Sequence, residues 1–340
     1  MRVAMFNAGT RQVTIEDVSM PAPRSGEVVI KIHRCGICGS DVSMTSEAPF
    51  SLKTGPFGHE YAGEVVHIGA GVESFRTGDR VTVVPVVPCG TCEYCRRFGN
   101  PMLCSNSQRA LQGFGEYAVV PASVAVRLPA SLSFADGSLV EPMACGLHAV
   151  RLAGCGPGKR VLVLGGGAMA LSAIYWARRT GADRVVVLSR SAHRAEMIIA
   201  VGGDAIVGFD PEDHVRLAEC LGGAPDIVAE CVGKQGMLDL ALTHVRPAGT
   251  ILSMGMCMHR ESIIPAQATS KEARMMFPLG YTMEEFAATA RALAVDRLRP
   301  ERMVGEVISL EQLPARLDAM RAGKGGAKVQ VDPARSGTMD

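Results

Sequence analysis

The sequence lacks a run of apolar residues long enough to cross a bilayer. Its longest uncharged apolar stretch, VLVLGGGAMALSAIYWA at 161–177, contains three glycines and falls short of the roughly 20 residues that a spanning helix needs. A charge bias is absent as well, because 35 Lys and Arg face 34 Asp and Glu, for a formal net charge of +1. These absences argue against membrane insertion and against bulk electrostatic attraction to nucleic acid.

A secretory signal is also missing from the first residues, MRVAMFNAGTRQ, which show no basic segment followed by an apolar one. Eleven cysteines in such a chain indicate metal binding or reactivity rather than disulfides. We therefore expect the protein to work in a reducing, cytoplasmic setting.

Three patterns divide the 340 residues. Up to about residue 146, short β-type runs such as VVIKIHRC and YAGEVVHIG are separated by Gly and Pro, which is typical of an all-β domain. From about 147 to 280, the strand candidates RVLVLG, RVVVLS, AIVGF, DIVAEC and TILSMG alternate with helical segments, which predicts a doubly wound parallel sheet. Two amphipathic segments and a last strand, AKVQV, follow from about 281.

A glycine-rich turn follows the first strand of that alternation. In RVLVLGGGAMA, the first and third glycines permit a tight turn and a close approach of the backbone to a pyrophosphate at the helix N-terminus. Ala170 takes the third position of this dinucleotide-binding fingerprint. A turn that is glycine-rich for structural reasons alone is the alternative. The residues predicted to contact a dinucleotide are Gly165, Gly166, Gly167, Ala168 and Met169.

The end of the second strand indicates which dinucleotide is preferred. A carboxylate there would accept the ribose hydroxyls of NAD, but this chain has Ser189 followed by Arg190, with Arg194 four residues further on. A small hydroxyl beside a guanidinium suits the 2′-phosphate of NADP, which arginine grips with a fork of donors. NADP is therefore the expected cofactor and NAD the second choice. The alternative for the two arginines is a solvated helix start.

Four cysteines lie close together in VPCGTCEYCRRFGNPMLC, within a lobe at 85–105. Two residues separate each of the first three, a spacing that suits a tetrahedral Zn²⁺ bound by thiolates only. Such a site is closed, so it stabilises a lobe without taking part in catalysis. Free cysteines or an iron–sulfur cluster are the alternatives. The predicted ligands of this structural zinc are Cys89, Cys92, Cys95 and Cys104.

A second cysteine pair occurs in RCGICGSDVSM at 34–44. It could be a redox couple or half of a zinc cage, but the surrounding sequence is β-rich and the other cysteine cluster is complete by itself. The next candidate ligands are His59 and Glu60, with Glu141 as another acidic candidate. One thiolate, one imidazole and carboxylates leave an open position, as a catalytic zinc needs. The alternative is a buried, hydrogen-bonded His59 and a surface Glu60.

Several motifs follow one another in a recognisable order: CGICGSD, GHEYAGEV, the CxxCxxC cluster, VEPMACGLHA, VLVLGGG, RPAGTI and the final AKVQV. In this order the chain resembles the zinc-dependent medium-chain dehydrogenases, in particular the sorbitol and threonine dehydrogenase branch. The resemblance implies an α/β protein with a GroES-like, β-rich catalytic domain at 1–146 and 281–340, a Rossmann domain at 147–280, and an active site in the cleft between them. It also implies a homodimer or homotetramer in which an edge strand near TILSMG pairs across the interface.

The same resemblance assigns the catalytic zinc ligands. Cys38 and His59 match two of the family's ligands, whereas Cys35 is structural. Glu60 matches a carboxylate that binds the zinc directly or exchanges with water. Glu141 matches the glutamate that this branch carries in place of a third thiolate. Whether Glu60 or Glu141 binds the zinc at rest is left open.

The proton relay and the nicotinamide pocket also follow from the resemblance. Ser40 matches the hydroxyl that begins the relay, but relatives often have a histidine where this chain has Ser43, so we expect the proton to leave through water. The gap from Cys38 to His59 is shorter than usual and the last cage spacing one residue longer, so we expect a reshaped substrate mouth and an intact cage. The residues that match the nicotinamide pocket are Cys231, Val232, Met254 and Gly255.

The expected function is zinc-dependent hydride transfer between NADP(H) and a small-molecule secondary alcohol, polyol or aminoalcohol and its ketone. A zinc-free quinone or enoyl reductase shares the scaffold, but such proteins lack the metal-ligand residues found here. A non-catalytic, cofactor-sensing protein is the alternative from a different class. Metal analysis separates the hypotheses, because two zinc ions per chain favour the dehydrogenase.

Overall fold

The computed structural model describes residues 1–46, 51–190, 192–295, 298, 300–326 and 328–336, and the chain divides into two compact units. The first unit comprises Met1–Glu141, Tyr281–Asp296 and Val304–Asp340. The second comprises Pro142–Gly280 and Arg297–Met303. The first crossing between the units therefore falls inside one helix, α4 (Val140–Leu152).

The first unit is built on a large, mostly antiparallel sheet with the strand order β10-β6-β5-β3-β18-β17, in which β9 also pairs with β3. Its long central strand β3 is rich in β-branched residues and buried over most of its length, as suits the middle of a sheet. The strands of this sheet are β3 (Glu27–Gly36), β5 (Glu60–Ile68), β6 (Arg80–Val83), β9 (Tyr117–Pro121), β10 (Ala125–Arg127), β17 (Val304–Ser309) and β18 (Lys328–Asp332).

Smaller elements surround this sheet. One short sheet has the order β2-β1-β4 and another pairs β7 with β8. Their bounds are β1 (Arg2–Phe6), β2 (Val13–Asp17), β4 (Gly55–Pro56), β7 (Val86–Val87) and β8 (Gln108–Arg109). The helices of this unit are α1 (Gly39–Met44), α2 (Glu93–Phe98), α3 (Phe134–Gly137), α10 (Met283–Leu293), α11 (Leu313–Arg321) and the 3₁₀ turns η1 (Pro101–Leu103) and η2 (Ala122–Val124).

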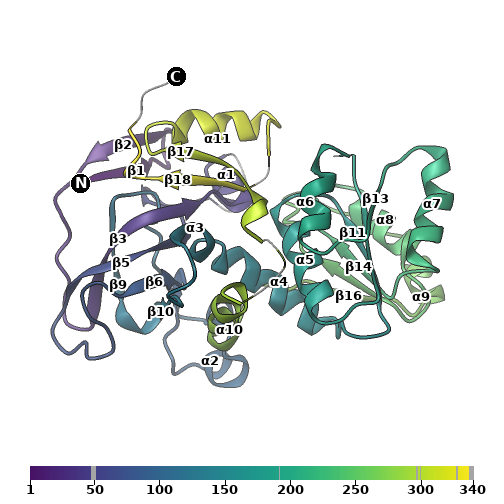
Figure 1. The fold of residues 1–340 in the computed structure, drawn as a ribbon, viewed down its shortest axis with the longest axis horizontal. Helices are drawn as coiled ribbons and strands as arrows, with labels where there is room; N and C mark the ends of the chain where they lie inside the picture. Colours follow the sequence, from purple (N-terminus) through teal and green to yellow (C-terminus); the bar gives the residue numbers. More distant parts are fainter. Residues whose placement is uncertain (47–50, 191, 296–297, 299, 327, 337–340) are drawn as a thin grey trace. The chain divides into compact units, whose positions relative to one another are not determined.

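The end of the chain completes the large sheet. Strand β18 lies between β3 and β17, pairing antiparallel with β3 and parallel with β17 (Figure 1). The last strand thus lies between two strands of a sheet whose other members come from residues 27–127 and from β17. Throughout the described part of the chain, no helix combines the length and the apolar character that a membrane span requires.

The second unit contains six parallel strands in the order β13-β12-β11-β14-β15-β16, which confirms the expected doubly wound sheet. Helices α5 and α6 lie on one side of this sheet and α7 and α8 on the other (Figure 1). The strands are β11 (Arg160–Leu164), β12 (Arg184–Leu188), β13 (Ala205–Val207), β14 (Ile227–Glu230), β15 (Thr250–Ser253) and β16 (Arg274–Met276). The helices are α5 (Ala168–Arg179), α6 (Ala195–Ala200), α7 (Pro211–Leu221), α8 (Met237–His244), α9 (Pro265–Ser270) and the turns η3 (Ala192–Arg194) and η4 (Pro300–Met303).

One expectation about this sheet is wrong. The strand near TILSMG, β15, is not an edge strand, because it pairs with β14 on one side and with β16 on the other. The edges of the sheet are β13 and β16. Strand β16 has only three residues, Arg-Met-Met, and none of them is β-branched, so the sequence pattern gave no signal for it.

Candidate metal centres and cofactor site

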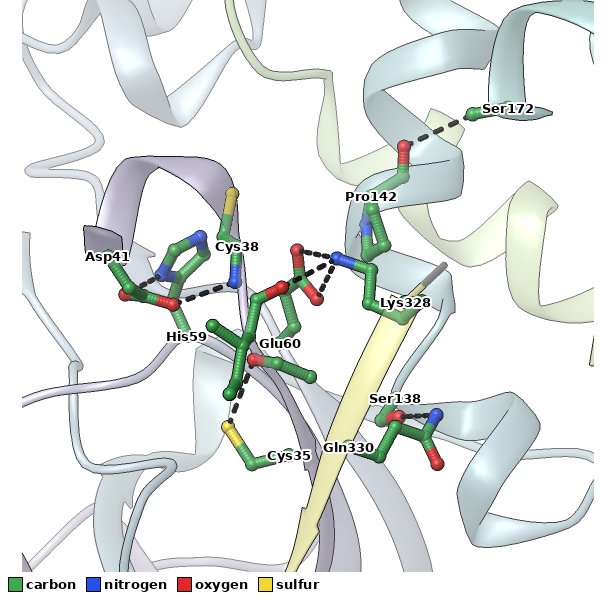
Figure 2. Close-up of polar contacts among 12 residues, drawn as sticks. Cys35, Cys38, Asp41, His59, Glu60, Ser138, Pro142, Ser172, Lys328 and Gln330 are labelled. Atoms are coloured by element: carbon green, nitrogen blue, oxygen red, sulfur yellow. Dashed lines mark hydrogen bonds and ion pairs between the residues drawn. The ribbon is translucent and has the colours of Figure 1, made fainter. Parts of the chain in front are cut away.

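Three metal-binding side chains meet where β3 ends and β5 begins (Figure 2). Cys38 lies two residues after β3, and His59 and Glu60 stand at the start of β5. These segments are adjacent because Gly36 pairs with Glu60 across the antiparallel strands. One ligand atom from each of Cys38, His59 and Glu60 lies within 4.8 Å of the others. A thiolate, an imidazole and a carboxylate form a donor set that Zn²⁺ accepts, so these residues fit the metal that the sequence predicts.

Asp41 connects two of these side chains. Its Oδ1 lies 3.2 Å from His59 Nδ1, and its Oδ2 accepts a hydrogen bond of 2.9 Å from the backbone N–H of Cys38. Burial by itself would lower the pKa of His59, but the Asp41 carboxylate outweighs burial and raises it well above its usual range. With Nδ1 directed at Asp41, Nε2 of His59 is left for a metal.

Glu60 forms a buried ion pair with Lys328. The Nζ of Lys328 lies 2.7 and 2.6 Å from the two carboxylate oxygens and also donates to the Ile37 carbonyl at 3.2 Å. The side chains are 0% and 2% exposed. Burial by itself would lower the pKa of Lys328, but the Glu60 charge raises it, so the ammonium form is retained.

Glu141 has a different partner. It lies in the first turn of α4, and its Oε1 accepts a hydrogen bond of 2.9 Å from the hydroxyl of Tyr281. Burial raises the pKa of Glu141 to about 7. The close group of described ligand atoms contains Cys38, His59 and Glu60 but not Glu141.

The other residues of the RCGICGSDVSM stretch take separate positions. Cys35 is fully buried in β3, its Sγ lies 3.6 Å from the Gly36 carbonyl oxygen, and burial raises its pKa well above the usual range. A buried, protonated thiol of this kind is a poor metal ligand or nucleophile. Ser40 and Ser43 lie on the short helix α1 that Cys38 precedes, and both are half-buried.

The second cysteine cluster forms a compact group in the first unit. The Sγ atoms of Cys92 and Cys95 are 3.4 Å apart, and that of Cys104 lies 3.9 Å from Cys92. Four sulfurs arranged tetrahedrally at a zinc–sulfur distance of about 2.3 Å lie roughly 3.8 Å apart, so the group has the right size for Zn²⁺. The backbone N–H of Cys95 lowers the pKa of Cys92 to about 5, which favours the thiolate that a metal needs. All four ligand atoms lie within 4.8 Å of one another.

The glycine-rich turn lies between β11 and α5. Gly165 follows β11 and has a φ of +103°, and a Cβ on it would lie 2.9 Å from Val232 Cγ2. Gly167 caps the N-terminus of α5, so the backbone N–H groups of Ala168 and Met169 begin that helix. The turn lies at the switch point of the strand order, between β11 and β14, where doubly wound sheets bind nucleotides.

The predicted specificity residues lie on the next strand end. Ser189 follows β12 and is buried, and the Gly166 peptide packs beside it. Arg194 is half-buried and donates a hydrogen bond of 2.7 Å to the Gly166 carbonyl, whereas Arg190 is exposed. The structure thus brings Ser189 and Arg194 to the glycine-rich turn.

Three of the four predicted pocket residues are hydrogen-bonded to one buried residue, Glu230 at the end of β14. Its Oε1 accepts hydrogen bonds of 2.6 and 2.9 Å from the N–H groups of Val232 and Gly233. Its carbonyl accepts from Met254 and Gly255 at 2.7 and 2.8 Å. The sulfurs of Cys231 and Met254 lie 4.0 Å apart. Glu230 therefore shapes this edge of the sheet, although no motif in the sequence marks it.

Comparison with known proteins identifies the family. The residues 24–130 match the model of the alcohol dehydrogenase GroES-like domain, and 168–295 match that of the zinc-binding dehydrogenases. Sorbitol dehydrogenase of Gallus gallus is 29% identical over 337 residues, which cover 96% of this chain and 94% of that protein. An uncharacterized zinc-type alcohol dehydrogenase-like protein of Escherichia coli is 31% identical over 314 residues, which cover 88% of each.

Solved structures agree with these relatives. 2R,3R-butanediol dehydrogenase from Bacillus subtilis has a TM-score of 0.86 at 27% identity and covers 98% of this chain and 99% of its own. A protein from Sinorhizobium meliloti, described as a zinc-binding dehydrogenase and bound to NADP, has a TM-score of 0.85 at 28% identity with the same coverage. The chain therefore belongs to the zinc-dependent medium-chain alcohol dehydrogenases, in their sorbitol dehydrogenase-like branch, and is an alcohol or polyol dehydrogenase that uses zinc and a nicotinamide cofactor.

Proposed function

We propose that this chain interconverts a secondary alcohol or polyol and its ketone, with NADP(H) as the hydride carrier and a catalytic zinc held by Cys38, His59 and a carboxylate. The observation that carries the proposal is the meeting of Cys38, His59 and Glu60 within 4.8 Å of one another. Three protein ligands leave a metal position open for a substrate oxygen. The relatives named for sorbitol and for 2R,3R-butanediol support a substrate with neighbouring hydroxyl groups.

When bound, the zinc supplies the positive charge that lowers the pKa of the substrate hydroxyl. The residues of the chain supply orientation and proton transfer. Asp41 fixes the His59 ring, and Oγ of Ser40 accepts the proton of the substrate hydroxyl and passes it to water. The bound dinucleotide would supply the redox chemistry, so that the alcohol would be oxidised to its ketone, NADP⁺ would be reduced and one proton would be released.

The cofactor is held by the second unit. The N-terminus of α5 and the turn Gly165–Met169 bind the pyrophosphate. Ser189 and Arg194 lie beside that turn, and Arg190 is exposed next to them, so two guanidinium groups are available to a 2′-phosphate. The pocket of Cys231, Val232, Met254 and Gly255 takes the nicotinamide.

The proposed cofactor preference has a direct test. Ser189→Asp combined with Arg190→Leu should lower the ratio of kcat/KM for NADP⁺ to that for NAD⁺ by about 100-fold, because a carboxylate accepts ribose hydroxyls and repels phosphate. Arg184→Leu is the matched control, since Arg184 is an exposed arginine at the opposite end of β12. An unchanged ratio would show that the phosphate is bound elsewhere.

The four-cysteine group is proposed to bind a structural zinc, and the reaction to need the other zinc. We expect two zinc ions per chain in the wild type and one in Cys38→Ser. The activity test measures absorbance at 340 nm with NADP⁺ or NAD⁺ against secondary alcohols, vicinal diols, sugars and aminoalcohols, with Cys38→Ser as the blank. Equal activity of that variant would contradict the zinc mechanism. Full zinc loading with no turnover across the panel would favour the cofactor-sensing alternative.

We also propose that the chain assembles as a homodimer or homotetramer. The observation behind this is the edge of the six-stranded sheet at β16, which pairs among the described residues with β15 alone, since an edge strand offers backbone groups to a second copy. Analytical ultracentrifugation tests it, and a monomer at micromolar concentration would refute it.

A further inference from the structure

In addition to the proposed metal, the Glu60 carboxylate has a cationic side chain next to it, that of Lys328 (Figure 2). Both of its oxygens lie within 2.7 Å of Lys328 Nζ. Neither side chain has more than 2% of its surface exposed, so water does not screen the pair. A metal bound by Cys38, His59 and Glu60 would therefore share this carboxylate with a buried ammonium group.

The strand register builds this arrangement. Glu60 on β5 is opposite Gly36 on β3, and Gly36 is opposite Gln330 on β18. A Cβ on Gly36 would lie 2.1 Å from Glu60 Oε2, so the carboxylate occupies the space that any other side chain on β3 would fill. The missing side chain lets Lys328 reach Glu60 across β3. The backbone pairing of β5, β3 and β18 therefore fixes the positions of both members of the ion pair, and both are buried.

We propose that Lys328 is a positioning residue that competes with the catalytic zinc for the Glu60 carboxylate and so sets how readily Glu60, which the family resemblance already gives as exchangeable, leaves the metal. This inference rests on the proposed function. A carboxylate shared between two cations binds each of them less tightly than a free carboxylate would. Glu141 differs, because its described partner at Oε1 is the uncharged hydroxyl of Tyr281. Lys328 also attracts the Glu141 carboxylate electrostatically, but it makes its direct contacts with the two oxygens of Glu60.

The competition makes an unusual prediction about zinc retention. Lys328→Met and Lys328→Gln should hold the catalytic zinc more tightly than the wild type, with release to a chelating dye slowed about tenfold, the lower end of the range for residues that act on metal ligands from outside. Turnover should fall in the same variants, because a tightly bound Glu60 blocks the exchangeable position. Lys328→Arg keeps the charge and should release zinc at nearly the wild-type rate.

The experiment follows zinc release from the purified, zinc-loaded protein. The zinc of the four-cysteine group serves as the reference within the same chain, since its release should be equal in all variants. If Lys328→Met folds poorly, Lys328→Gln replaces it, because glutamine lacks the positive charge but can still donate a hydrogen bond to Glu60. Faster or unchanged release of the catalytic zinc in these variants would overturn the proposal, because a lysine that only supports the fold weakens the site when removed.

A double-mutant cycle with Glu60→Gln separates competition from other effects. Replacing Lys328 in the Glu60→Gln background should leave zinc release unchanged, because the charge for which the two cations compete is gone. An equal slowing in both backgrounds would show that Lys328 acts by another route. Failure of the proposed function looks different: the wild type would then hold one zinc per chain and Cys38→Ser would hold the same.

Discussion

Replacing Asp41 with asparagine tests the part of the site that positions both Cys38 and His59. The carboxylate accepts from the Cys38 backbone N–H at 2.9 Å and faces His59 Nδ1 at 3.2 Å, and it is 1% exposed. Asparagine has nearly the same shape, but only one of its two terminal atoms accepts hydrogen bonds. In the variant, an amide NH₂ must therefore face either the Cys38 N–H or the His59 N–H.

The magnitude follows from these two contacts. A hydrogen bond to a charged group contributes about 1.5–3 kcal/mol. Asp41→Asn loses one of two such bonds, that to the Cys38 N–H or that to His59. Changes to partners of metal-binding histidines cost about 10–100-fold in metal affinity, which is about 1.4–2.7 kcal/mol. The two figures agree, so we expect Asp41→Asn to weaken catalytic zinc binding by roughly 10–100-fold and to reduce turnover where zinc is limiting.

The assay is a zinc titration against a competing chelator, with turnover measured in parallel. Asp79→Asn is the matched control, because the Asp79 carboxylate also accepts from one backbone N–H, that of Arg76, and from one side-chain cation, that of Arg127. That variant should bind both zinc ions normally. Wild-type zinc affinity in Asp41→Asn, or an equal loss in Asp79→Asn, would show that Asp41 does not act through the metal ligands.

Three further predictions concern stability and the second metal. Lys271 Nζ donates hydrogen bonds of 2.7–2.8 Å to three carbonyls at the end of α8. Lys271→Met should therefore reduce the free energy of unfolding, measured by urea denaturation, by about 1–3 kcal/mol, and an unchanged free energy would contradict this. Burial alone would raise the pKa of Asp226, but hydrogen bonds from the Arg160 N–H and the Arg246 side chain outweigh it and lower that pKa. The stabilisation is therefore complete above the unfolded pKa of about 4 and is lost as the pH falls from there through the lower folded pKa. Asp226→Asn should cost about 1 kcal/mol at pH 7 and progressively less as the pH is lowered below about 4, whereas a cost independent of pH would refute the assignment. Cys104→Ser should remove one zinc per chain and lower the melting midpoint by about 5–10 °C, and full zinc content would exclude the cage.

Much of the second unit could be predicted from the sequence, because its helices and strands carry strong local signals. The segment AMALSAIYWARR coincides with α5, and the run of valines in RVVVL forms β12. Strand β17 (VGEVIS) was missed, since its burial pattern shows no regular alternation between buried and exposed residues. The edge of the parallel sheet was misplaced for a related reason, because β16 exists only through its pairing with β15.

In the candidate site, too, residues within a short sequence motif could be predicted, whereas contacts between residues far apart in the sequence could not. Cys38, His59 and Glu60 could be found because a short motif contains each of them. Asp41 was missed, although an acidic residue three positions after a helix cap is a known capping arrangement and gave a usable signal. Lys328 gave no signal for a buried charge, because β18 alternates polar residues with valines (KVQVD), and its partner Glu60 is 268 positions away.

That distance has a consequence for how the site forms. Glu60 and Lys328 are both buried, and an unpaired buried charge is strongly unfavourable, so each needs the other in the first unit when no metal is bound. Lys328 lies on β18, which must pair with β3 before the ion pair can form. The carboxylate beside Cys38 and His59 is therefore fixed only when the end of the chain has entered the sheet. Binding of the catalytic metal is for this reason tied to completion of the whole β-rich unit, whereas the four-cysteine group takes all its ligands from one short segment, Cys89 to Cys104.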